Sequence, residues 1–232
     1  MTRLRMGLRG AIAIAVVGTV LGPLTAGASA ETANSNTEFS VTAGTLAFVT
    51  APTLPELAAV TLNGEAQTTH ASTAMANFKV KDATGTGNGW HVSIGSRATS
   101  GTTVSAVFKQ YCESASNCTS SEAHKYASSS PKELAAGSLT LSSTGATFSP
   151  SGAEAPTYAA ECGGSGPCVV DTGAEGTTHK VVTAAVNKGM GRYEMGGWAT
   201  SSLTLTTPAT LYALNANEVY RVDVLWTLAS AP

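Results

Sequence analysis

Apolar and polar positions alternate in the last thirteen residues of the chain, YRVDVLWTLASAP. The apolar row consists of Tyr220, Val222, Val224, Trp226 and Leu228. Side chains of a β-strand point in turn to opposite faces, so a period of two predicts a strand with one buried face. The hydrophobicity of this segment indicates that it docks as the closing strand of the fold.

Short segments of the same kind recur from Phe39 onward. They are FSVTAGTLAFV (39–49), ANFKVKD (76–82), WHVSI (90–94), TVSAVFK (103–109), SLTLS (138–142), HKVVTAAV (179–186) and SSLTLTT (201–207). Only LPELAAV (54–60) and SEAHKYA (121–127) could form a helical turn or two, because no long stripe of period 3.6 is present. Many short strands between turn residues predict an all-β fold, an antiparallel β-sandwich or barrel.

The first thirty residues have the pattern of a signal peptide. Arg3, Arg5 and Arg9 precede a short apolar run, and Ala28-Ser29-Ala30 provides small residues for a cleavage site. The apolar run is too short and too interrupted by glycine and proline for a spanning helix. We therefore expect cleavage after Ala30 and a secreted single domain over residues 31–232. No cysteine lies near this junction, so we expect no lipid or membrane anchor.

Charge argues against two classes of partner. Charged residues make up only 12% of the chain, and removal of three arginines would change the formal net charge from −2 to −5. Nucleic acids and anionic lipid surfaces are bound by clustered lysine and arginine, so neither is an expected partner. The frequent threonine and valine residues favour strands over helices.

The four cysteines form two local pairs of equal spacing, Cys112 with Cys118 and Cys162 with Cys168. In an exported chain such cysteines indicate disulfides, and four cysteines allow three connectivities. Two small loops are the simplest of these, and a zinc site is the weaker interpretation because the spacing lacks Cys-x-x-Cys and an adjacent histidine. Each pair falls in a long polar segment, 110–133 or 149–178, so we expect the disulfides to stiffen loops. These segments are either functional loops or tolerated insertions.

No catalytic constellation is evident, so we expect a protein without enzymatic activity, cofactor or metal. The four histidines are dispersed, and no aspartate forms an evident acid-base pair. GGSGP (163–167) differs from the nucleophile elbow at its final position, and no phosphate loop or dinucleotide fingerprint is present. Asp82 could bind Ca²⁺ together with nearby carbonyls, although capping its own turn is the favoured alternative.

Two segments together resemble a known family. The first is a glycine-rich corner followed by a tryptophan strand, with Asp82, Gly85, Gly87, Gly89 and Trp90 as the matching residues. The second is the closing strand, with Tyr220, Trp226, Leu228 and Pro232. In this combination the sequence resembles the WxL domain, a cell-surface module of Gram-positive bacteria, over nearly all of residues 31–232.

This resemblance implies non-covalent attachment to the cell wall through peptidoglycan. Exposed tryptophan or tyrosine could stack on the apolar faces of sugar rings. Trp226 shares its row with aliphatic residues, so it is either a core residue or a ligand contact, and the same alternatives hold for Trp90. As a second hypothesis, the chain is a structural or adhesive surface subunit that engages another surface protein by strand pairing.

Overall fold

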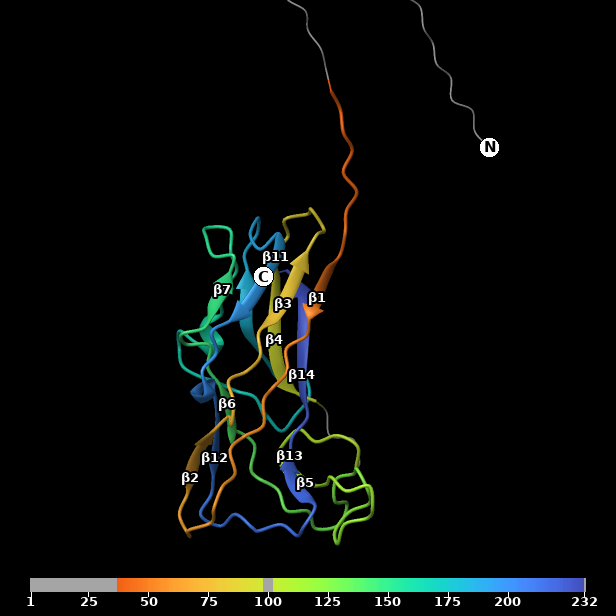
Figure 1. The fold of residues 1–232 in the computed structure, drawn as a ribbon, viewed down its shortest axis with the longest axis vertical. Helices are drawn as coiled ribbons and strands as arrows, with labels where there is room; N and C mark the ends of the chain where they lie inside the picture. Colours follow the sequence, from red (N-terminus) through yellow and green to blue (C-terminus); the bar gives the residue numbers. More distant parts are fainter. Residues whose placement is uncertain (1–36, 98–101, 232) are drawn as a thin grey trace, which may run out of the picture. The chain divides into compact units, whose positions relative to one another are not determined.

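The computed structural model describes residues 37–97 and 102–231 (Figure 1). Backbone contacts divide the chain into two units, Met1–Val41 and Thr42–Pro232, and every described strand belongs to the second. The expected signal segment and the cleavage position after Ala30 lie outside the described residues.

Every pairing between the described strands is antiparallel, which confirms the predicted all-β class. Two short 3₁₀ turns, η1 (Ala160–Cys162) and η2 (Thr200–Ser202), are the helical elements of this region. The strands are β1 (Leu46–Thr50), β2 (Gln67–His70), β3 (Phe78–Asp82), β4 (Trp90–Ser96), β5 (Lys109–Cys112), β6 (Leu139–Leu141), β7 (Thr147–Ser149), β8 (Thr157–Tyr158), β9 (Cys168–Val169), β10 (Thr178–Ala184), β11 (Gly191–Gly196), β12 (Leu203–Thr207), β13 (Glu218–Arg221) and β14 (Val224–Ser230).

Two four-stranded sheets pack against each other as an open sandwich. Their strand orders are β1-β3-β11-β7 and β14-β4-β10-β8. Ring contacts connect the two layers near both sides: Phe78 of β3 lies 5.9 Å from Trp226 of β14, and Phe148 of β7 lies 4.3 Å from Tyr158 of β8, measured between centroids. Figure 1 shows β1 and β14 together at one side of these layers.

The remaining strands extend the same hydrophobic core. A third sheet has the order β2-β12-β6-β9, and β13 pairs with β5 in a two-stranded sheet. Alternate leucines of β6 and β12 point inward and join one buried cluster with the sandwich residues. The members of that cluster from these two strands are Leu139, Leu141, Leu203 and Leu205.

The closing segment is divided into two strands, so the expectation of one continuous strand was wrong. β13 pairs with β5, whereas β14 pairs with β4 in another sheet. The chain changes sheets at Asp223, whose N–H donates to Ser105 O (2.9 Å) and whose carbonyl accepts from Arg97 N–H (3.0 Å). The predicted apolar row nevertheless packs against the core on both sides of this break.

Other predictions were only partly correct. The strand expected over 39–49 begins at Leu46, and the segment 103–109 is not a strand, since β5 starts at Lys109. Neither 54–60 nor 121–127 is helical. The sequence did not predict β2, β7, β8, β9 or β11, and β8 and β9 lie in the segment 149–178 that was expected to be a loop. In β11 charged and glycine residues flank the two inward residues, Tyr193 and Met195, and weaken the apolar signal.

Both local disulfides are present, Cys112–Cys118 and Cys162–Cys168, as the simplest connectivity predicted. The expectation that both serve only to stiffen loops was wrong for the second pair. Cys162 and Cys168 are 0% and 3% exposed and belong to the hydrophobic cluster. Cys168 begins β9, which pairs with β6, so this disulfide packs among core strands.

We predict that replacing Cys162 and Cys168 by alanine lowers the free energy of unfolding more than the same change at Cys112 and Cys118. Both loops span the same sequence separation of 6 residues, so the loop-entropy loss is about 2 kcal/mol for each. Loss of core packing should add about 1 kcal/mol for the buried pair. Urea unfolding of the two double variants measures the difference, and equal losses would contradict a packing role.

Candidate functional site

The glycine-rich corner between β3 and β4 is held by its own side chains. Asp82 is buried, and its Oδ1 accepts hydrogen bonds from Thr84 N–H (3.0 Å) and Thr84 Oγ1 (2.7 Å). Gly89 has a φ of +76°, and a Cβ there would lie 2.4 Å from Ala184 O. A side chain at Gly89 would therefore both strain the backbone and collide with β10. The arrangement makes Asp82 a turn cap.

The corner delivers Trp90 into the core. Trp90 is 0% exposed, and its Nε1–H donates to Gly189 O at 3.0 Å. Gly189 approaches so closely that a Cβ on it would lie 2.8 Å from that indole nitrogen. Trp90 therefore has no surface available to a ligand and serves the fold.

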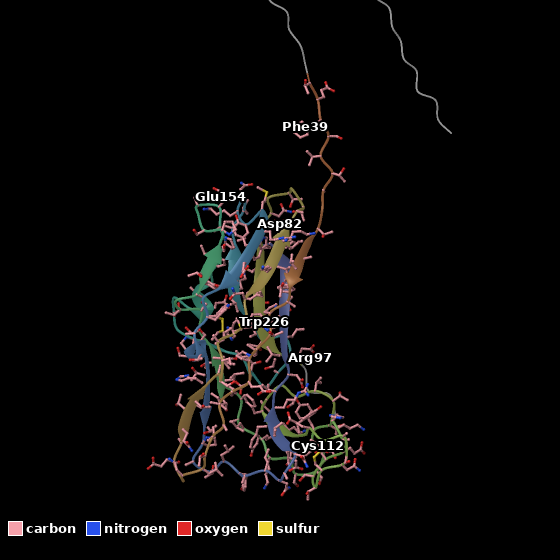
Figure 2. The ribbon with its side chains drawn as sticks, in the orientation of Figure 1. Phe39, Asp82, Arg97, Cys112, Glu154 and Trp226 are labelled. Carbon is pink, nitrogen blue, oxygen red and sulfur yellow. A yellow bond between two sulfur atoms is a disulfide. The ribbon has the colours of Figure 1, made fainter. Side chains whose placement is uncertain are left out.

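The two halves of the sequence pattern form one ladder. In the register of β14 with β4, Trp226 lies opposite Ile94 and Leu228 opposite Val92. Beyond the ladder, Ala231 N–H donates to Gly89 O (3.1 Å), and His91 Nδ1 lies 2.6 Å from Ala231 O. Figure 2 labels Trp226, which belongs to the edge strand β14. Trp226 is half-buried, and its ring centroid lies 5.9 Å from that of Phe78. Trp90 and Trp226 are thus core-facing residues of the adjacent strands β4 and β14.

We predict different costs for Trp90→Phe and Trp226→Phe. The first leaves the buried Gly189 carbonyl without its donor and should lower the free energy of unfolding by about 2 kcal/mol or more. The second removes part of a half-buried ring and should cost no more than about 1 kcal/mol. Equilibrium urea unfolding tests this order, and a larger loss at Trp226 would contradict the assignment of Trp90 as the central residue.

Tyr220, the third aromatic residue of the pattern, lies in a different environment. It is half-buried on β13, and its hydroxyl donates to Tyr212 O at 3.0 Å. Two adjoining hollows of about 520 and 500 Å³ meet beside it, and we call them together the Tyr220 groove. Residues shared by both hollows are Leu57, Phe108, Val219 and Tyr220. Volumes of several hundred Å³ with mostly apolar walls are typical of ligand sites.

The rim of the groove carries aromatic and charged groups. Tyr212 is 61% exposed, and Lys132 Nζ lies 3.8 Å from the centroid of its ring. More than half of the surface of Tyr212 is thus open to solvent. Arg221, Glu56 and Glu113 line the hollow on the other side of Tyr220. The groove therefore offers an apolar floor, an accessible tyrosine and hydrogen-bonding groups.

Two acids, the buried Glu218 and the partly buried Asp223, hold β13 and its neighbours in place beside this groove. Glu218 accepts hydrogen bonds from Gln110 Nε2 (2.8 Å), Ser120 N–H (3.1 Å) and Asn215 Nδ2 (3.1 Å). Burial acts to raise the pKa of Glu218, but these hydrogen bonds outweigh it and hold the pKa below its ordinary value. Asp223 Oδ2 accepts from Ser105 N–H (2.9 Å) and Tyr126 OH (2.6 Å). These contacts attach the strand that carries Tyr220 to the disulfide-bonded loop.

A third acid, Asp171, positions the start of β6. It is fully buried, and its oxygens accept from Ser138 N–H (3.0 Å) and Leu139 N–H (2.8 Å). Leu139 also lines the Tyr220 groove. Burial raises the pKa of Asp171 to about 6, although these backbone donors oppose the rise.

We predict that Asp171 makes the protein less stable as the pH rises from about 4 to about 6. In this interval the unfolded chain has released the proton while the folded chain retains it, so deprotonation favours unfolding. Two pKa units correspond to about 3 kcal/mol. Urea unfolding across this range, compared with Asp171→Asn, should show the slope only in the parent protein. The prediction would be contradicted if the free energy of unfolding changes with pH in the same way in the parent protein and in Asp171→Asn.

The sequence pattern includes Tyr220 but gives no sign of the groove around it. Tyr212 was missed because a single aromatic residue in a loop produces no periodic signal, and Phe108 was missed because the segment 103–109 was expected to be a strand. Gly85, Gly87 and Gly89 have positive φ values in the corner, and Asp82 accepts a hydrogen bond from Thr84 N–H at its start. No set of three or more histidine, cysteine, aspartate or glutamate side chains in the described residues is arranged to hold a metal. No described helix has the length and hydrophobicity of a membrane crossing.

These features define an all-β domain with two disulfides, a tryptophan core and an open apolar groove. Residues 29–232 match the WxL domain, which is described as a surface cell wall-binding domain. The chain belongs to this family, as the two sequence segments indicated. No curated protein and no solved structure matches the chain.

Proposed function

We propose that this chain is a secreted surface protein that attaches non-covalently to the peptidoglycan of a Gram-positive cell wall. Membership of a surface cell wall-binding family supports wall attachment. The signal-peptide pattern that ends at Ala30 supports secretion, with Glu31 as the first residue of the mature chain. The proposal assigns binding, without enzymatic activity, to residues 31–232.

The positions of Trp90, Trp226 and Tyr220, the aromatic residues of the sequence pattern, support our proposal for the binding surface. Trp90 is fully buried and Trp226 faces the core, whereas Tyr220 lies in a groove beside the exposed Tyr212. Of the aromatic residues in the sequence pattern, Tyr220 is thus the one located in an open groove. We assign the Tyr220 groove as the wall-binding surface and Tyr212 as its stacking residue.

The chemistry of the groove suits a glycan better than a charged polymer. Sugar rings present apolar faces that pack against an aromatic ring, and their hydroxyls require nearby donors and acceptors. The Tyr220 hydroxyl and the rim carboxylates of Glu56 and Glu113 provide such groups. With a formal net charge of −5 after cleavage, the mature chain gains no attraction from polyanionic wall polymers.

Sedimentation with purified cell-wall sacculi tests this function. The mature protein should sediment with sacculi stripped of anionic polymers, and the bound fraction should depend little on salt. Tyr212→Ala should weaken binding roughly three- to tenfold because a stacking contact is lost. Val186→Ala is the matched control, since Val186 is similarly exposed (59%) but lies outside the groove.

Circular dichroism and thermal unfolding of each variant separate lost binding from lost folding. A folded parent protein that remains in solution would contradict wall attachment itself. A parent protein that sediments, together with unchanged binding by Tyr212→Ala, would contradict the assignment of the groove. Binding that disappears after removal of anionic polymers would contradict peptidoglycan as the ligand.

A further inference from the structure

β14 is a sheet edge that lies near β1 of the facing sheet but forms no strand pair with it. It is the outer strand of the sheet β14-β4-β10-β8, and in the described part of the chain no strand pairs with its other side. Natural edges are commonly short or carry charges, prolines or bulges that prevent pairing with another chain. β14 has seven residues, VLWTLAS, and contains neither a charge nor a proline. The β1 edge, in comparison, has an irregular register between Phe48 and Thr50.

The inward side chains of this edge are incompletely covered. Trp90, Val92 and Ile94 of the neighbouring β4 are all 0% exposed. The corresponding row on β14, Val224, Trp226 and Leu228, is only partly buried although it packs against the same cluster. Outward, Leu225 is 43% exposed. An additional strand beside β14 would complete the cover of this row.

The chain also contains a segment with strand character that has no partner. Phe39, Ser40, Val41 and Thr42 alternate between apolar and polar residues, and the sequence predicted a strand here. In the structure residues 37–45 are not a strand, and all are exposed. Phe39 and Val41 are 88% and 81% exposed, more than any other large hydrophobic residue described. Exposed apolar residues in such a pattern indicate an interaction surface.

We propose that residues 37–43 of one molecule add as a strand to the β14 edge of a second copy. The segment is as long as β14, and Phe39 and Val41 would cover the half-buried row that contains Trp226. No like charges oppose this pairing, since β14 is uncharged and Glu38 is the one charge of the segment. Donor and acceptor are different surfaces of the chain, so the contact is head-to-tail and links successive molecules unless the ring closes.

Site-directed crosslinking of the mature chain tests this contact. Ser40→Cys is mixed with Leu225→Cys, Thr227→Cys or Ala229→Cys, three alternate positions on the outward face of β14. At least one mixture should give a disulfide-linked pair at ten times the yield of Ser40→Cys mixed with Val186→Cys. An affinity tag on one partner identifies mixed products, and the native disulfides are retained.

Light scattering against concentration gives an independent measurement. The parent protein should form oligomers, with a blue shift of tryptophan emission as Trp226 is covered. Phe39→Ser/Val41→Ser should remove association without lowering the unfolding temperature, because both side chains are exposed. Leu225→Lys should also remove it, whereas Val186→Lys should not. The proposal would be overturned if the parent protein stays monomeric and the β14 cysteine variants crosslink with Ser40→Cys no more than Val186→Cys does. A synthetic peptide of residues 37–45 that binds a persistently monomeric chain would overturn the second copy as occupant.

Discussion

The fold depends on the ladder between β4 and β14. β4 begins with Trp90, whose indole is fixed by the Gly189 carbonyl, and it forms strand pairs with both β10 and β14. The glycine corner before β4 and Ala231 after β14 are joined by the bond from Ala231 N–H to Gly89 O. Both sheets of the sandwich contribute side chains around this ladder, and the buried cluster extends from it to β6 and β12.

The break at Asp223 gives the closing segment two roles. Before the break, β13 brings Tyr220 to the groove, and after it, β14 brings Trp226 to the sandwich core. The Asp223 carboxylate contacts Ser105, Tyr126 and Arg221, which belong to three different parts of the chain. One conspicuous sequence pattern is therefore shared between an open groove and a structural core. Trp226 of this pattern packs against the core, and Tyr220 lines the groove.

The class of fold and the strands β3, β4, β6, β10 and β12 follow from alternation, because each has an inward row of apolar residues. β11 and the absence of a strand over residues 39–45 could not be predicted, since strand formation depends on partners distant in sequence. Residue spacing correctly predicted the two cysteine loops, but not that Cys162 enters the core. The Tyr220 groove also arises from tertiary packing, as its shared residues span Leu57 to Tyr220.

The β4–β14 ladder also affects when the domain can fold. His91 and Ala231, which meet at its end, are 140 residues apart in sequence. Contacts of such long range slow folding because a large loop must close before they form. Until residues 224–230 are available, β4 has no partner on one side, and the ladder that begins at Trp90 is incomplete. Completion of this domain therefore depends on a contact that cannot form before β14 is available, however early β4 has been made.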